Sequence, residues 1–299
     1  MSDPFPWRRF YGRTPAQLTY PDVSVYEAVA EAARRTPNAV AWEFLGEAGA
    51  FRELIEDIDR CAAVFHSLGV RRGHRVLISM PTSPQGITAF YAANRLGATA
   101  AMLHPLSTAP EITQALDATG ARVAVVLDAF FGTMAAAAPK LPLEAIVVAR
   151  IPDVLPPLKR LGFWLTRGRK IAKLGDDPRI HRWADRLAAA SPLRTPPERS
   201  ESDEAVILFS GGTTGQPKGI VLSNRNFVSE GLQVAALAGM EKNDAMLAIL
   251  PLFHGFGLGV CVNAVLMAGG TSILVPVFTP EDVAKLLKKR RPTLLVGVP

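Results

Sequence analysis

The chain has 299 residues, a formal net charge of +6 and a hydrophobic content of 48%. This length suffices for one large domain or two smaller ones, and the composition excludes a disordered or fibrous protein. The opening stretch MSDPFPWRRFYGR lacks the apolar run of a secretion signal, and the chain has no long Lys/Arg tract typical of nucleic-acid binding. We therefore expect a cytoplasmic protein that binds no nucleic acid, and the basic charge favours another anionic partner.

Short apolar runs alternate with amphipathic segments along most of the chain. The spacing of Leu54, Ile58 and Phe65 predicts an amphipathic helix over 52–68, which Gly69 ends. Further helices are predicted at 84–96, 109–119, from about 223 to 239, and at 280–290. Strands are predicted at 40–45, 75–79, 98–103, 122–127, 145–149, 205–210, 220–223 and 292–299. This alternation predicts an α/β fold of layered βαβ sheets flanked by helices.

Residues 245–280 contain no Asp, Glu, Lys or Arg, which raises the question of a membrane span. Glycines and prolines break the stretch into short pieces, with His254 and Asn263 inside it. We therefore expect a buried strand, a helix near 260–267 and a second strand in an α/β core. The two cysteines, Cys61 and Cys261, have no metal-ligand spacing and are expected to be structural thiols of a reducing compartment.

The prolines of residues 150–200 suggest an insertion that closes an N-terminal subdomain, 1–200, before a second one, 201–299. Within the insertion, 154–175 carries six basic residues, no acid and several interleaved apolar side chains. Two interpretations stay open: a solvated basic surface, or a segment that rests on anionic lipid. Gly162 and Gly168 weaken any helix there.

The stretch SGGTTGQPKG, residues 210–219, joins two predicted strands. Its glycines let backbone N–H groups converge on an anion, and its hydroxyls and lysine add further donors. The candidate phosphate-binding residues are Ser210, Gly211, Gly212, Thr213, Thr214, Gly215 and Lys218. An ordinary glycine-rich hairpin loop is the alternative, although ten residues is long for a tight hairpin. A P-loop NTPase is disfavoured because Gly219, and no Ser or Thr, follows the lysine.

The segment FSGGTTGQPKGIVLSNRNF resembles the phosphate-binding signature of the adenylate-forming enzymes, the acyl-CoA synthetase superfamily. LPLFHGFGLG at 250–259 resembles the next motif of that family, and residues 69–112 are similar to its N-terminal βαβ region, with His74 in place of the usual aspartate. GGTTG and the basic insertion most resemble the long-chain fatty acyl-CoA ligases. The resemblance implies the incomplete large N-terminal domain of an acyl-adenylate-forming enzyme.

The resemblance implies a ligase that uses ATP, Mg²⁺ and coenzyme A to convert a fatty acid or other carboxylate into a thioester through acyl-AMP. The loop and Lys218 would then hold the β- and γ-phosphates and stabilise the pyrophosphate leaving group. His254 would lie beside the acyl carboxylate, and Gly255, Gly257 and Gly259 would leave room for the acyl chain. Without the resemblance, His254 reads as a core histidine at a glycine-rich turn.

The adenine-binding segment and the lysine that promotes adenylation, as the family has them, are not found in this sequence. Two interpretations therefore stay open. The chain is the N-terminal part of such a ligase, inactive alone, or it is a non-catalytic half that binds phosphate or acyl groups or pairs with a separate C-terminal half. Peripheral membrane contact through 154–175 is a further hypothesis.

Overall fold

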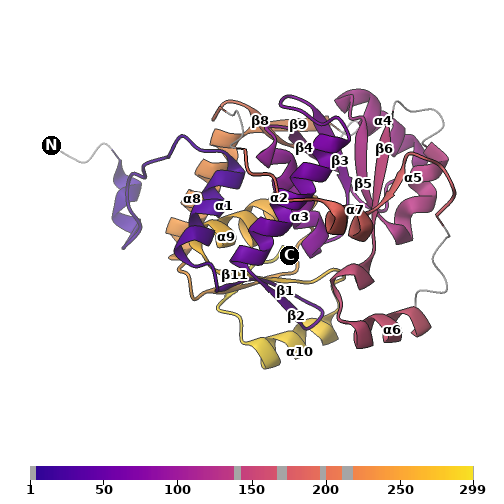
Figure 1. Cartoon of the computed structure of the whole chain (residues 1–299). Coiled ribbons are helices and arrows are strands. Elements are labelled where there is room, and N and C mark those ends of the chain that lie inside the picture. Colours follow the sequence, from indigo (N-terminus) through magenta and orange to yellow (C-terminus); the bar gives the residue numbers. More distant parts are fainter. Residues whose placement is uncertain (1–4, 138–142, 167–173, 196–199, 211–217, 299) are drawn as a thin grey trace.

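The structure is a computed structural model that describes residues 5–137, 143–166, 174–195, 200–210 and 218–298. A seven-stranded sheet forms its larger half, in the order β7-β6-β5-β3-β4-β8-β9 (Figure 1). All neighbours pair in parallel except β8 and β9, which form an antiparallel hairpin. The strands are β3 (Arg75–Ser79), β4 (Thr99–Met102), β5 (Val123–Leu127), β6 (Ala145–Ala149), β7 (Ile180–Arg182), β8 (Glu204–Ser210) and β9 (Lys218–Ser223).

A second sheet of five strands has the order β12-β10-β11-β1-β2 and is parallel except for the β1–β2 hairpin. Its strands are β1 (Val40–Phe44), β2 (Glu47–Ala50), β10 (Ala245–Ala248), β11 (Thr271–Leu274) and β12 (Leu294–Leu295). Strands from both sides of residue 200 therefore contribute to both sheets. A division of the chain at residue 200 stays a prediction, and any such division has to accommodate this shared pairing.

Helices fill the space between the two sheets and cover their outer faces (Figure 1). The inner layer contains α1 (Val25–Arg35), α2 (Phe51–Ser67), α3 (Pro84–Arg95), α8 (Asn224–Ala238), a π-helix (Phe256–Ala264) and α9 (Val265–Ala268). On the far face of the larger sheet, α4 (Ala109–Thr119) and α5 (Phe131–Ala137) pack on Leu77, Ala101 and Val126. On the far face of the smaller sheet, α10 (Pro280–Arg290) packs through Val283. The other α-helices of the described ranges, α6 (Pro157–Thr166) and α7 (Trp183–Ala189), belong to the predicted insertion, and short 3₁₀-helices lie at Pro6–Phe10, Asp128–Phe130 and Ile151–Val154.

The predicted α/β class of layered sheets flanked by helices is confirmed. The predicted helix at 52–68 is α2. The charge-free stretch forms β10, the π-helix, α9 and β11, whose residues are mostly buried, whereas His254, Phe256, Val277 and Phe278 are exposed. None of the helices in the described ranges combines the length and apolar character that a bilayer-spanning segment requires. Both cysteines are buried free thiols, and burial raises the pKa of Cys261 to about 12.

The basic insertion contains a helix that the sequence analysis disfavoured. Helix α6 runs through Gly162, at which an added Cβ would meet no atom within 4 Å. The glycine costs about 1 kcal/mol of helix propensity, which the rest of the segment outweighs. Arg167, Arg169, Lys170 and Lys173 lie outside the described residues.

The inner layer contains a buried chain of hydrogen bonds and, close to it, a half-buried carboxyl. The Tyr91 hydroxyl donates to Asn263 Oδ1 (3.1 Å), and Asn263 Nδ2 donates to the Phe227 carbonyl oxygen (3.1 Å), which joins α3, the π-helix and α8. One turn further along α8, the Glu230 carboxyl lies against Gly259 of the π-helix, and its Oε2 is buried without a hydrogen-bond partner among the described residues. Burial raises the pKa of Glu230 to about 7.

This raised pKa predicts that stability falls as the pH rises. Between about pH 4.5 and pH 7 the unfolded chain has already released the Glu230 proton whereas the folded protein still holds it, so deprotonation favours unfolding. We expect Glu230→Gln to be more stable than the wild type at pH 8, with the difference shrinking towards pH 4.5, in urea denaturation. Glu281→Gln, at an exposed position on α10, is the control. An equal difference at both pH values would contradict this assignment.

Candidate active site

The carboxyl ends of the parallel strands β3, β4, β5 and β8 meet at one edge of the larger sheet. Chains that leave such an edge form the usual ligand-binding crevice of parallel α/β sheets. Two residues of interest leave the sheet here: His104, two residues after β4, and Ser210, the last residue of β8. Because β4 pairs directly with β8, with Met102 opposite Leu208, these two segments leave the sheet side by side.

The stretch 210–219 joins β8 to β9, and these two predicted strands pair antiparallel. Ser210 lies opposite Lys218 in the last register of that antiparallel pair. Lys218 is exposed, so its ammonium group is accessible to an anion at the loop. Gly211, Gly212, Thr213, Thr214 and Gly215 lie outside the described residues. Their role in binding phosphate stays a prediction.

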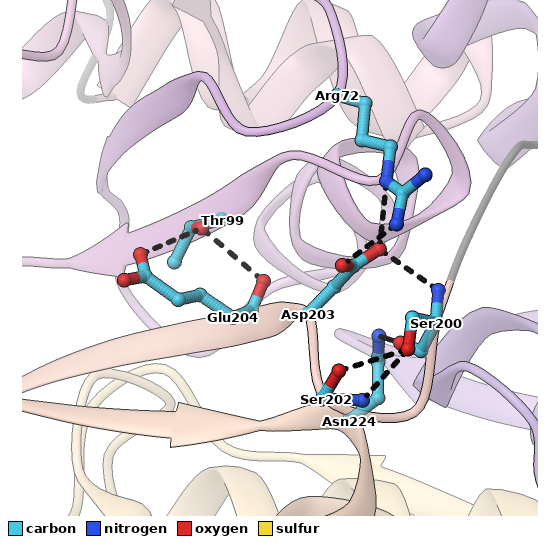
Figure 2. Close-up of polar contacts among 7 residues, drawn as sticks. All are labelled: Arg72, Thr99, Ser200, Ser202, Asp203, Glu204 and Asn224. Carbon is cyan, nitrogen blue, oxygen red and sulfur yellow. Dashed lines mark hydrogen bonds and ion pairs between the residues drawn. The ribbon is translucent and has the colours of Figure 1, made fainter.

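The opposite end of the hairpin is held by a network of hydrogen bonds and an ion pair (Figure 2). Figure 2 shows the Arg72 guanidinium donating to both oxygens of the Asp203 carboxylate (2.9 and 3.0 Å) and the Thr99 hydroxyl donating to the Glu204 carbonyl (3.2 Å). Asn224 Nδ2, from the first turn of α8, donates to the Ser200 carbonyl (3.1 Å). The hairpin is therefore anchored at its base, and Ser210 and Lys218 lie at its other end.

A third segment reaches the same edge from the smaller sheet. After β10, residues 250–257 lead into the π-helix, and the backbone N–H of His254 donates to the Pro251 carbonyl (3.1 Å). A Cβ on residue 257 would lie 2.0 Å from the Pro251 oxygen, so glycine is required there. In this tight turn the His254 side chain is exposed to solvent, while the neighbouring Phe253 side chain is buried.

The expected space for an acyl chain at the three glycines of this motif is filled by the protein itself. A Cβ at Gly255 would contact Leu208 (3.1 Å), and one at Gly259 would meet the Glu230 carboxyl (2.8 Å). Together with Gly257, these glycines let the chain pack closely on its own backbone and side chains. The acyl-chain path at these positions is therefore not supported by the described residues.

A pocket of about 380 Å³ lies where these three segments converge. Its wall contains two of the predicted residues, Ser210 and His254. The remaining wall residues come from the end of β4, the segment after it, helix α4 and the residues next to the predicted ones: Met102, Leu103, His104, Leu106, Ser107, Glu111, Gln114, Ala115, Ala118, Phe209 and Phe253. A mostly apolar pocket with a few convergent polar groups is typical of a small-molecule site.

His104 is a candidate site residue that the sequence analysis did not single out. Its ring centroid lies 4.3 Å from that of Phe253, whose centroid is 4.9 Å from that of His254. Partial burial lowers the pKa of His104, and the nearby His254 lowers it further, whereas the Glu111 carboxylate opposes both effects. A polar residue directly after a buried strand of a βαβ unit was the available signal, since that is where ligand-binding residues leave a parallel sheet.

Glu111, which shares the pocket wall, has a structural role. Its carboxylate accepts hydrogen bonds from the backbone N–H (2.7 Å) and hydroxyl (3.1 Å) of Thr108 at the start of α4. Among the described residues, no group of three or more His, Cys, Asp or Glu side chains is arranged to hold a metal ion. The pocket therefore offers hydrogen-bond donors and an apolar wall.

Comparison with known proteins agrees with this description. The sequence matches the family described as AMP-binding enzyme over residues 29–299, and the chain belongs to that family. It is 29% identical over 300 residues to a long-chain-fatty-acid–CoA ligase of Bacillus subtilis, covering 98% of this chain and 54% of that protein. It is 28% identical over 278 residues to a salicyl-AMP ligase/salicyl-S-ArCP synthetase of Mycobacterium tuberculosis, covering 91% of this chain and 46% of that one.

Solved structures show the same fold. The crystal structure of the anthranilate CoA ligase AuaEII in complex with anthranoyl-AMP superposes with a TM-score of 0.80 at 21% identity, covering 94% of this chain and 50% of that one. The chain thus spans about half the length of the relatives it matches. The predicted membership of the adenylate-forming superfamily is confirmed.

The close packing at Gly257 leads to a testable prediction. Gly257→Ala places a methyl group against the Pro251 carbonyl and forces the 250–257 turn apart, so we expect a loss of about 1–3 kcal/mol in the free energy of unfolding. Gly132→Ala is the matched control, because a Cβ at Gly132 in α5 meets no atom within 4 Å. Urea denaturation of both variants measures the difference, and equal stabilities would contradict the described turn.

Proposed function

We propose that this chain is the substrate- and phosphate-binding part of an ATP-dependent acyl-CoA ligase for fatty acids. The observation that carries the proposal is the pocket at the carboxyl edge of the larger sheet, where Ser210 and His254 share one wall. Membership of the AMP-binding enzyme family supports it. The reaction joins an acid to AMP with release of pyrophosphate and then transfers the acyl group to the thiol of coenzyme A.

Each residue has a role in this proposal. Ser210, Lys218 and the loop between them, including Thr213 and Thr214, bind the β- and γ-phosphates and stabilise the negative charge that develops on pyrophosphate. His254 donates a hydrogen bond to the carboxylate of the acid and so orients it for attack on the α-phosphorus. Mg²⁺ supplies charge neutralisation at the phosphate oxygens. The exposed Lys218 beside Ser210 is the kind of donor that a polyphosphate requires.

The identity of the acid substrate is a separate part of the proposal. A fatty acid is favoured by the likeness to the long-chain ligase, while the mycobacterial relative is named for an aryl acid. The chain spans about half of these relatives, so the proposed activity belongs to this chain together with the complementary half of such an enzyme, in the same or a separate polypeptide. A non-catalytic half that binds phosphate or acyl groups is the alternative, and formation of acyl-AMP distinguishes the two.

Peripheral membrane contact is a second proposal, carried by helix α6. Leu158, Leu161 and Leu165 are 83%, 55% and 53% exposed, which places a stripe of leucines in solvent. The neighbouring cations face the protein instead. Lys159 pairs with Glu47, and Arg160 donates to the carbonyl oxygens of Pro152 and Leu155. Insertion of the leucines into an anionic bilayer would therefore contribute more than the charge of these two residues.

The phosphate-binding role predicts slow adenylation in loop variants. In the enzyme that contains this chain, Lys218→Ala and Thr214→Ala should each reduce ATP–pyrophosphate exchange by about 10- to 1000-fold, as loss of one charge-stabilising donor does. Lys285→Ala, whose ammonium pairs with Asp282 on α10, is the matched control. Wild-type rates in both loop variants would contradict the assignment of the loop.

The membrane proposal predicts that the leucines of α6 decide vesicle binding. Leu158→Asp combined with Leu161→Asp should weaken flotation with anionic vesicles by more than tenfold, since each buried leucine contributes about 1.5–3 kcal/mol. Leu237→Asp, at a 75% exposed position on α8, should leave flotation unchanged. Equal flotation of all three proteins would rule out insertion through α6.

A further inference from the structure

The pocket wall contains a second histidine that the proposed mechanism does not use. His104 follows β4, and Leu103 immediately before it is buried, with its backbone N–H donating to the Ile78 carbonyl (2.9 Å). The His104 side chain is nevertheless exposed, and so is that of His254. Both imidazoles lie near the buried ring of Phe253, with centroid distances of 4.3 Å for His104 and 4.9 Å for His254. Two exposed imidazoles thus share one pocket.

The ring of His104 is oriented by its own backbone. Its Nδ1 accepts a hydrogen bond from the backbone N–H of Leu106 (3.0 Å). A neutral imidazole that accepts at Nδ1 carries its proton at Nε2. The Nε2–H is therefore a donor, and no described residue provides it with an acceptor through a hydrogen bond. The Nε2–H is thus free to donate to water or to a ligand that enters the pocket.

The remaining wall of the pocket determines which ligand fits. Among the described residues that line it there is no Lys or Arg, and Glu111 is the one with a charged side chain. Most of its other residues are apolar: Met102, Leu103, Leu106, Ala115, Ala118, Phe209 and Phe253. A multiply charged phosphate needs several cations and would be repelled by Glu111, whereas a single carboxylate with an apolar body matches two imidazoles and an apolar wall.

We propose that His104 is a second acid-binding residue, which donates its Nε2–H to the substrate carboxylate in the pocket that it shares with His254. This inference rests on the proposed function, because it concerns the acid that the ligase activates. The hydrogen bond becomes charge-assisted when His104 takes up a proton at Nδ1, which ends the hydrogen bond from the Leu106 N–H, and the charge of a bound anion favours that protonation. Acid binding is therefore linked to proton uptake at His104.

The groups that face His104 set the sign of this linkage. Burial and His254 hold the pKa of His104 below its usual range, and Glu111 at the start of α4 only partly offsets them. A carboxylate beside the ring adds an opposing charge and raises that pKa. The affinity for the acid should thus increase as the pH falls from 8 to 6, as long as the acid itself stays ionised.

Octanoate binding to the 299-residue chain tests the proposal. Imidazole resonances of the wild type are followed by NMR during octanoate titrations at pH 6 and pH 8, with octanol as the probe that lacks a carboxylate. We expect saturable shifts at both His104 and His254 with octanoate, a raised pKa of His104 in the bound state, and tighter binding at pH 6. His104→Gln should weaken binding about tenfold at pH 6 and remove most of its pH dependence.

The control and the opposing outcomes separate this inference from the proposed function. His66→Gln, at an exposed position on α2, should bind octanoate as the wild type does at both pH values. Octanoate shifts at His254 without any at His104, equal affinities in His104→Gln and the wild type, or absence of binding would each overturn the role of His104. Shifts at His104 with pyrophosphate alone would assign it to phosphate and also overturn the proposal. Octanoate binding through both histidines, without acyl-AMP formation by the complete enzyme, would overturn the ligase activity and leave this inference standing.

Discussion

The parallel pairing of β4 with β8 is the interaction on which the candidate site depends. Ala100, Ala101 and Met102 pair with Val206, Ile207 and Leu208, although about a hundred residues separate the two strands in sequence. Because both strands run in the same direction, the segments that follow them leave the sheet at one edge. His104 and Ser210 meet in one pocket for that reason. The Arg72–Asp203 ion pair and the Asn224 hydrogen bonds fix the base of β8, so the register of the pair is supported away from the ligand (Figure 2).

The second constraint is the close approach of the 250–257 turn to its own backbone. Gly257 allows that turn, and the π-helix after it is held by the buried hydrogen bonds of Asn263 with Tyr91 and Phe227. This arrangement fixes Phe253 beneath two exposed imidazoles. The segment that follows β10 of the smaller sheet thereby contributes His254 to a pocket whose other wall residues mostly follow strands of the larger sheet. The helical layer packs against both sheets and so fixes their relative position.

The sequence predicts the fold class well because the strands that carry it are buried on both faces and read as short apolar runs, such as 75–79 and 145–149. It misses β2, whose four residues EAGA have no strand character and pair only because β1 lies beside them. Helix α1 could have been predicted from the sequence, because Ser24 and Glu27 form a capping box at its start. The π-helix has no local signal, because its apolar, small-residue composition is equally that of an ordinary helix, and tertiary contacts at Gly257 and Asn263 distinguish it.

The sequence predicts only those residues of the candidate site that belong to a local sequence motif. The loop at 210–219 and His254 carry local signatures, whereas His104 becomes a site residue only when β4 is placed beside β8 and Phe253 beneath its ring. The expectation that Gly255, Gly257 and Gly259 leave room for an acyl chain comes from the glycine pattern of their motif. A glycine pattern shows that something approaches closely, and here the protein's own Leu208, Pro251 and Glu230 do so.

The central claim is that one edge of the larger sheet binds the nucleotide phosphates and the acid together. The most direct measurement is a map of backbone amide resonances in the 299-residue chain during titration with a non-hydrolysable ATP analogue and Mg²⁺. The account predicts saturable changes at Ser210 and Lys218 with the ATP analogue, and changes at 103–107 and 253–254 when octanoate is then added. Changes concentrated at the opposite edge of the sheet, around Gly73 and Arg75, would contradict it.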